Sequence, residues 1–321
     1  MFIEQGIKPE NRFWKYLVGS VIIISASVIG QLPLLIAIGM KAMSTGEAMP
    51  TTNDEVMGYL ELNLNLFLIL LSFLFALIAI VLVVKHIHKQ KFKEIVTGRS
   101  KVDYRRVMLS FGIWMLFSII TTIIGYYIEP ESFVLQFDLW KFIPLFFIAI
   151  VMVPIQTSVE ELVFRGYLMQ GFGNLAKNKW FPLVMTSVIF GGMHIANPEV
   201  GKMGYLIMVY YIGTGFFLGI MTLMDEGAEL ALGFHAANNL GGVLLVTADW
   251  TAFKTYSVFV DVSEPTAGTD ILFPVLVIFP IVLFIFSRIY KWTNWKEKLT
   301  GKVHLQTLNE ISINQKEQGH E

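Results

Sequence analysis

Long apolar segments dominate the chain and limit what it can fold into. A helix needs roughly 20 mostly apolar residues to cross a bilayer. Eight stretches of the 321-residue chain approach or exceed that length, at about 16–40, 62–84, 107–128, 140–171, 180–195, 203–224, 227–247 and 271–290. Because backbone groups must be satisfied internally in lipid, only helices or closed barrels span a membrane. The sequence therefore predicts an all-α, polytopic integral membrane protein with about eight transmembrane helices.

Composition narrows the possible functions. The chain is 55% hydrophobic and 15% charged, as membrane proteins are, and its net charge of −1 provides no basic field for nucleic acid. Cysteine is absent, which excludes disulfides, thiolate metal sites, a cysteine nucleophile and lipid attachment through cysteine. The first apolar segment is too long for a removable signal peptide and lacks a small-residue cleavage site, so we expect none.

Basic residues predict the orientation. If the N-terminus is inside, 20 of the 24 Lys and Arg residues lie on the inner side of the membrane. This bias predicts that both termini are cytoplasmic. Among the inner segments, the stretch 85–93 carries His86 and His88 between lysines, and we interpret it as a solvated loop rather than a metal or nucleotide site. We expect Glu229 to stabilise the N-terminal end of the seventh helix.

Two adjacent glutamates, Glu160 and Glu161, interrupt the longest apolar segment. A charge at membrane depth costs at least about 2.5–3.5 kcal/mol on insertion scales, so an intramembrane acid is a functional-site hypothesis. Arg165 follows Glu161 at i,i+4 with the acid first, the better orientation for a helical ion pair. We interpret Glu161 and Arg165 as supporting residues. Glu160 projects about 100° away from Glu161 and can face a different partner.

Two of the six histidines, His194 and His235, lie within or at the edge of apolar segments. From the helical rise, Glu160, His194 and His235 lie about 18, 21 and 12–17 Å from the cytoplasmic ends of their helices, so the three can meet. His235 and Asn239 are i,i+4 and share a face, which suits donors for a developing oxyanion. A positioned carboxylate can act as a general base on water. Each of these residues also has a possible structural role. Glu160 could be paired with Arg165, His194 and His235 could be hydrogen-bonded within helix contacts, and Asn239 could join two helices.

Three motifs occur in order on separate segments: Glu-Glu-x-x-x-Arg at 160–165, Phe-x-x-x-His at 190–194 and His-x-x-x-Asn at 235–239. Together they resemble the CPBP family of intramembrane proteases, over roughly residues 140–245. That family includes type II CAAX prenyl endopeptidases and bacterial proteins linked to bacteriocin self-immunity.

The resemblance implies a role for each motif residue. Glu160 and His194 would activate the attacking water, and His235 and Asn239 would stabilise the oxyanion. It also allows a divalent metal, such as zinc, on Glu160, His194 and His235, which would make the protein a metalloprotease. The family's site opens toward the cytoplasm, in agreement with the predicted topology.

We divide the chain into three regions on this basis. Residues 1–139 would form about three N-terminal transmembrane helices with their loops. Residues 140–247 would form the catalytic helical core. Residues 248–321 would hold an outer loop, the last transmembrane helix and a cytoplasmic tail.

The sequence thus predicts a hydrolase that cleaves a membrane-associated or lipidated peptide, in the cell membrane of a prokaryote. We expect membrane lipids and such a peptide as partners, and no nucleic acid. A proton- or metal-coupled transporter is one alternative, because intramembrane acids and histidines also line ion pathways. The lack of an internal repeat counts against it. A non-enzymatic immunity or scaffold protein that keeps the motifs as a binding pocket is the other alternative.

Overall fold

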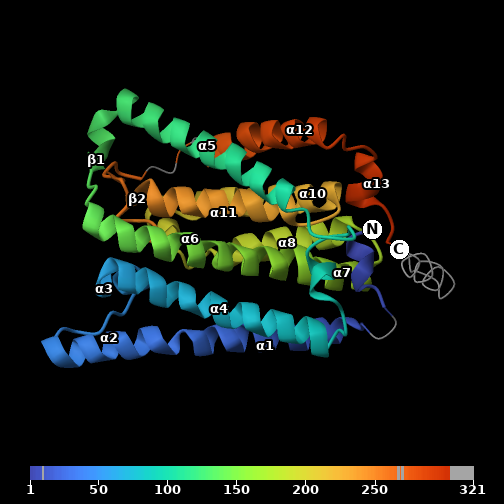
Figure 1. Ribbon diagram of the computed structural model, residues 1–321, viewed down its shortest axis with the longest axis horizontal. Coiled ribbons are helices and arrows are strands. Elements are labelled where there is room, and N and C mark those ends of the chain that lie inside the picture. The colour runs from blue at the N-terminus through green and yellow to red at the C-terminus, as the bar shows by residue number, and fades with distance from the viewer. Residues whose placement is uncertain (9–10, 266–267, 269–270, 304–321) are drawn as a thin grey trace.

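The computed structural model describes residues 1–8, 11–265, 268 and 271–303. Its helices lie side by side along one long axis (Figure 1), so the predicted all-α membrane fold is confirmed. Five helical runs are long and apolar enough to cross a bilayer: Phe13–Thr45, Leu62–His86, Tyr104–Ile128, Leu139–Ala176 and Tyr205–Asp225. Two shorter apolar helices, Trp180–Met193 and Pro274–Ile289, accompany them.

All eight predicted segments contain helix, with bounds that differ by a few residues from the expected ones. The helices are α1 (Phe13–Gly30), α2 (Leu32–Thr45), α3 (Asn53–Tyr59), α4 (Leu62–His86), α5 (Tyr104–Ile128), α6 (Leu139–Glu161), α7 (Met169–Ala176), α8 (Trp180–Met193), α9 (Pro198–Met203), α10 (Met208–Asp225), α11 (Glu229–Leu244), α12 (Phe279–Ile289) and α13 (Trp295–Thr300). Two π-helical segments, Leu162–Leu168 and Pro274–Ile278, join α6 to α7 and precede α12. Short 3₁₀ turns lie at Ile3–Gly6, Phe92–Ile95, Pro130–Ser132 and Tyr205–Ile207.

The first apolar segment forms two helices instead of one. α1 ends at Gly30, and α2 begins at Leu32 with Pro33 in its first turn. Proline is tolerated there because the amide groups of a first turn have no intrahelical partner. The seventh segment, α11, has only 16 residues, which is less than a bilayer requires. The number of complete spans therefore stays a prediction.

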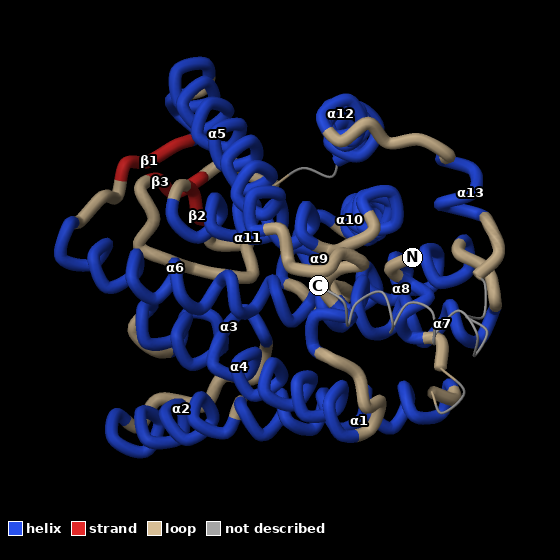
Figure 2. The backbone as a smooth tube through the Cα atoms, turned by 45° about the vertical axis from the view of Figure 1, so that its right-hand side comes forward, coloured by secondary structure: helices blue, strands red, loops and turns tan. Residues whose placement is uncertain are grey.

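A small three-stranded sheet closes one end of the bundle (Figure 2). Its strands are β1 (Phe133–Leu135), β2 (Val246–Ala248) and β3 (Phe259–Asp261). The central strand β3 runs antiparallel to β1 and parallel to β2, with Val260 opposite Val134 and Thr247. The sheet ties the loop after α5 to the chain that follows α11.

Helix α11 occupies the middle of the bundle, where it packs against α5, α6 and α10. Gly233 makes the closest of these contacts possible, since a Cβ there would lie 2.1 Å from the carbonyl oxygen of Val107 on α5. Gly215 of α10 has the same role against α8, where a Cβ would lie 2.7 Å from the Ser187 carbonyl oxygen. Small residues allow helices in membranes to approach closely. Helix α11 also packs along α6, and α8 and α10 contact the π-helical segment that follows α6.

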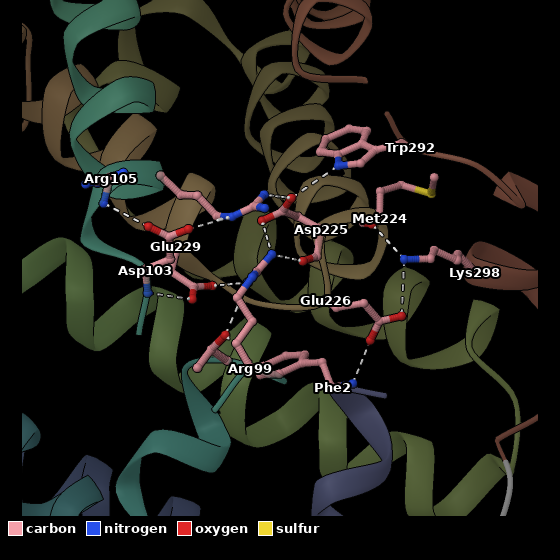
Figure 3. A network of polar contacts seen from close by, with 12 residues as sticks. Phe2, Arg99, Asp103, Arg105, Met224, Asp225, Glu226, Glu229, Trp292 and Lys298 are labelled. Carbon is pink, nitrogen blue, oxygen red and sulfur yellow. Dashed lines mark hydrogen bonds and ion pairs between the residues drawn. The ribbon is translucent and has the colours of Figure 1, made fainter. Parts of the chain in front are cut away.

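The segments expected on the cytoplasmic side gather at one end of the bundle (Figure 1) and form a polar network there (Figure 3). Arg99 pairs with Asp225 at 2.8 Å and with Glu229 at 3.0 Å, and Arg106 also pairs with Asp225. Glu229 is fully buried, so its role goes beyond the expected support of a helix dipole. Glu226 accepts a hydrogen bond from the Phe2 amide and pairs with a lysine of α13. The network joins the N-terminus, the α4–α5 loop, the α10–α11 turn and α13.

The expectation of a fully solvated loop at 85–93 is wrong for His88. His86 is exposed, but His88 is 2% exposed. Its Nδ1 atom lies 3.1 Å from Asn11 Oδ1, and its Nε2 atom lies 2.9 Å from the hydroxyl oxygen of Tyr167. The histidine therefore links the N-terminal segment to the π-helical segment that follows Glu161.

Candidate active site

The acidic pair lies where α6 changes into a π-helix. α6 ends at Glu161, and the seven residues Leu162–Leu168, which include Arg165, continue in π geometry. Such segments are rare and occur frequently at functional sites. Glu161 and Arg165 are completely buried, whereas the Glu160 side chain keeps 18% of its surface accessible. The two neighbouring acids thus have different environments.

His235 of α11 lies between the two carboxylates. Its Nδ1 atom is 2.7 Å from Glu161 Oε1, and its Nε2 atom is 3.5 Å from Glu160 Oε2. The imidazole is only 7% exposed, so these two acids dominate its polar surroundings. The structure therefore brings together the first and third motifs of the sequence.

Glu161 and Arg165 form the ion pair that their spacing predicts. Arg165 Nη1 lies 3.3 Å from Glu161 Oε1, and Nη2 donates to the Gly215 carbonyl at 3.3 Å. The guanidinium also lies over the Phe190 ring, 4.3 Å from its centroid. Glu161 has a second function that spacing did not indicate, because the same Oε1 atom accepts the hydrogen bond from His235. The buried Glu161–Arg165 pair thus also orients the His235 ring.

Gln156, which the sequence analysis did not select, contacts Glu160 directly. It lies one helical turn earlier on α6, and its Nε2 atom donates to Glu160 Oε1 at 2.6 Å. The other carboxylate oxygen, Oε2, is buried and has no hydrogen-bond partner within the described part of the chain. The i,i+4 spacing of Gln156 and Glu160 was the one sequence signal for this contact.

His194 lies at the C-terminal end of α8. Its Nδ1 atom is 2.8 Å from the Phe190 carbonyl oxygen, which can only accept, so Nδ1 carries a proton, and in the neutral ring Nε2 keeps its lone pair. The ring stacks on Tyr211, with centroids 4.5 Å apart. Phe190 contacts both imidazoles, with its centroid 4.9 Å from that of His194 and 6.0 Å from that of His235. His194 also lies within electrostatic range of Glu160 and His235. The second motif therefore borders the same site.

Asn239 joins the site through amide contacts. Its Nδ2 atom donates to Gln156 Oε1 at 3.0 Å, and its Oδ1 atom accepts from Asn238 at 3.2 Å. Asn239 lies one turn after His235 on α11, so both side chains face the end of α6. The second N–H of the Asn239 amide makes no hydrogen bond among the described residues.

The arrangement of donors argues against a preformed metal shell. Among the residues that the structure describes, no group of three or more His, Asp or Glu side chains is placed to hold a metal ion. Both nitrogens of His235 face carboxylates, and Glu160 Oε1 already accepts from Gln156. The suggested metal on Glu160, His194 and His235 stays a prediction.

Comparison with known proteins agrees with this site. Residues 139–241, which contain all three motifs, match the family described as Rce1-like type II CAAX prenyl endopeptidases. The uncharacterized protein YyaK of Bacillus subtilis (strain 168) is 31% identical over 242 residues, covering 75% of this chain and 80% of that protein. No solved structure matches the chain significantly. The apolar helices and the family together identify an integral membrane protein. The chain belongs to the Rce1-like family of type II CAAX prenyl endopeptidases, a family of membrane proteases.

Proposed function

We propose that the protein is an intramembrane endopeptidase that hydrolyses a peptide bond of a membrane-associated or lipidated peptide, with Glu160 as general base. One observation carries the proposal. Glu160 Oε2 is buried and accepts no hydrogen bond among the described residues, and it faces the Nε2 atom of His235 at 3.5 Å. A buried polar atom without a hydrogen bond is costly, and a catalytic role is one of the reasons that retain such an atom.

Water activation is assigned to Glu160 and His194. Gln156 holds Glu160 Oε1, which leaves Oε2 to accept a proton from water. The His194 tautomer leaves Nε2 as an acceptor that can orient the same water. The hydroxide formed in this way attacks the carbonyl carbon of the scissile bond. Glu160 then returns the proton to the leaving nitrogen as the C–N bond breaks.

Stabilisation of the oxyanion is assigned to His235 and Asn239. Glu161 accepts from His235 Nδ1, which orients the ring. With a proton on Nε2 as well, the ring and the free N–H of Asn239 donate to the oxygen of the tetrahedral intermediate. Loss of one oxyanion donor typically costs about 10²–10³ in rate. Arg165 neutralises Glu161 and is assigned no contact with substrate.

The family favours a prenylated peptide as the substrate. A lipid chain on the peptide would remain in the bilayer while the peptide reaches the acidic pair from the cytoplasmic side. The experiment therefore uses purified protein in proteoliposomes and an internally quenched peptide with a farnesylated C-terminal Cys-aliphatic-aliphatic-X sequence. A library of unprenylated membrane peptides is tested in parallel.

Wild-type protein should cleave at least one of these peptides, and Glu160→Gln should reduce kcat by about 10³-fold or more while accumulating normally in the membrane. Glu226→Gln, the same change in the polar network at the cytoplasmic end, should retain activity. Normal turnover by the Glu160 variant would refute the assignment.

Loss of cleavage with a chelator, restored by zinc, would show that a metal is required and would overturn the metal-free mechanism. Ion flux into the liposomes without proteolysis would support a transporter, and binding without cleavage would support a scaffold.

A further inference from the structure

A chain of hydrogen bonds runs from helix α5 through α11 to the proposed general base on α6. Trp114 Nε1 donates to Asn238 Oδ1 at 3.1 Å, and Asn238 Nδ2 donates to Asn239 Oδ1 at 3.2 Å. Asn239 Nδ2 donates to Gln156 Oε1 at 3.0 Å, and Gln156 Nε2 donates to Glu160 Oε1 at 2.6 Å. Four hydrogen bonds thus connect five side chains, and we call this series the amide relay.

The two ends of the relay fix its direction. An indole N–H can only donate, and an ionised carboxylate can only accept. Each amide between them must therefore accept a hydrogen bond on its oxygen from the Trp114 side. It must donate one from its nitrogen toward Glu160. If any one of the three amides turned over, two oxygens or two NH₂ groups would face each other. Trp114 and Glu160 together determine the orientation of every amide between them.

This direction matters at the two places assigned to catalysis. It keeps Asn239 Oδ1 engaged with Asn238, so that the NH₂ group and not the oxygen faces the site. It also keeps Glu160 Oε1 as an acceptor for Gln156, which leaves Oε2 as the oxygen that takes a proton from water. A turned amide at Asn239 would present an oxygen to the oxyanion, which is repulsive.

We propose that Gln156 is a positioning residue that couples the general base Glu160 to the oxyanion donor Asn239, with Trp114 setting the direction through Asn238. This inference rests on the proposed function, since it assumes the roles of Glu160 and Asn239. Gln156 does not act on the substrate itself. Its two hydrogen bonds hold two reacting groups of different helices in one geometry, and small errors in such geometry reduce rates strongly.

A simpler role for Gln156 is to join α6 to α11. It is 4% exposed, and buried amides are generally hydrogen-bonded whatever their function. The two roles predict different results. A purely structural contact affects stability and the amount of folded protein. A positioning residue affects kcat in the folded fraction, and its effect depends on Trp114.

The first test replaces Gln156 by methionine, which has a similar size but makes neither hydrogen bond. The matched control is Gln170→Met, because Gln170 is fully buried on the following helix α7 and its amide is also hydrogen-bonded on both sides. It donates to the Glu94 and Phe2 carbonyls and accepts from Gln90. With the farnesylated peptide, Gln156→Met should lower kcat by about 30–100-fold and leave KM within about twofold. Gln170→Met should lower thermal stability and leave kcat of the folded protein near wild type.

The second test is a double-mutant cycle with Trp114→Phe. Phenylalanine keeps the aromatic packing against Phe234 and Phe117 but removes the N–H donor. Alone, this change should lower kcat by about 3–10-fold, because Asn238 and Asn239 lose the group that fixes their orientation. In the Gln156→Met background the same change should cost less than about twofold, since the relay is already broken. Effects that simply multiply would overturn the coupling.

The third test does not depend on activity. In protein labelled with ¹⁵N on the tryptophan indoles, the Trp114 signal is identified by its loss in Trp114→Phe. It should be protected from exchange with D₂O and should shift in Gln156→Met but not in Gln170→Met, because hydrogen bonds in series polarise one another. An unshifted signal in Gln156→Met would contradict the relay.

The outcomes separate this inference from the proposed function. If Glu160→Gln retains activity, the proposed function fails and the indole measurement alone decides whether the relay exists. If Glu160→Gln is inactive but Gln156→Met has the kcat of wild type, the proposed function stands and the positioning role is refuted.

Discussion

At the residue scale, the site depends on buried charged side chains that pair with one another. Glu161 contacts both Arg165 and His235, and both carboxylates of the acidic pair face the same imidazole. Depth and i,i+4 spacing predicted Glu160, His235 and the Glu161–Arg165 pair from the sequence. The i,i+4 spacing of Gln156 and Glu160 was too weak a signal to select Gln156, because a neutral amide in an apolar helix has many possible partners. The contact of Glu161 with His235 also depends on how two helices pack, which spacing within one helix does not determine.

Glu161→Gln should destabilise the protein, because Arg165 would keep its charge in a site with no exposed surface. Breaking one side of a buried ion pair typically costs about 3–5 kcal/mol. The thermal unfolding midpoint in detergent measures this loss. Glu47→Gln is the control, since Glu47 pairs with Lys41 at the exposed surface and such pairs contribute little. Equal midpoints for wild type and Glu161→Gln would show that the pair is not a structural support.

His88 should make stability depend on pH. Burial, and to a lesser extent the charge of Lys15, lower the pKa of His88 to about 4. The unfolded chain binds a proton near pH 6.5, whereas the folded protein does not until about pH 4. This contribution to stability is therefore complete above pH 6.5 and is lost as the pH falls toward 4.

Unfolding midpoints measured from pH 7.5 to pH 4 test this expectation. His88→Gln should show a weaker dependence on pH than wild type between 6.5 and 4. His86 lies two residues away and its side chain is exposed, so His86→Gln should keep the wild-type dependence of the unfolding midpoint on pH. The same slope in all three proteins would contradict the assignment to His88.

At the element scale, the π-helical segment after Glu161 and the short helix α11 bring the motifs together. Apolar length predicted helix over all eight segments, but it could not distinguish π from α geometry over seven residues. That choice depends on which carbonyl each amide reaches once the neighbouring helices are packed. The three-residue strands β1, β2 and β3 were missed for a similar reason. They pair only because the ends of α5 and α11 place their loops side by side.

Gly233→Ala should separate α11 from α5 and move His235, which lies two residues later. The added Cβ would lie 2.1 Å from the Val107 carbonyl oxygen, a contact that requires a backbone shift. Overpacking of this kind typically costs about 1–3 kcal/mol. The unfolding midpoint should fall and peptide cleavage should fall with it. Gly242→Ala is the control on the same helix, because among the described residues no atom outside the adjoining turns of α11 lies within 4 Å of its added Cβ. Wild-type stability and cleavage in Gly233→Ala would argue against close packing at this point.

At the scale of the whole molecule, the basic connecting segments lie at one end of the bundle and the sheet at the other (Figure 1). Counts of Lys and Arg predicted this grouping from the sequence. They could not predict the ion pairs of Arg99 and Arg106, which join the α4–α5 connection to the α10–α11 turn, far apart in the chain. The arrangement places the acidic pair between the two ends, within a continuous helical run of 38 residues.

The absence of native cysteine allows a direct test of orientation. Ser100→Cys lies in the α4–α5 loop and Ser44→Cys at the end of α2, and both positions are exposed. In intact cells a membrane-impermeant maleimide should label Ser44→Cys but not Ser100→Cys. After permeabilisation it should label both. Labelling of Ser100→Cys in intact cells would reverse the predicted topology and place the basic end outside.

Whether the chemistry depends on the carboxylate of residue 160 is measured most directly by single-turnover cleavage. Wild type and Glu160→Gln, at equal amounts in proteoliposomes, are compared on the first peptide that the wild type cleaves. We predict a rate about 10³-fold or more lower in the variant, with unchanged binding of the peptide, because the glutamine cannot accept a proton from water. A variant that cleaves at the wild-type rate would contradict the proposed active site.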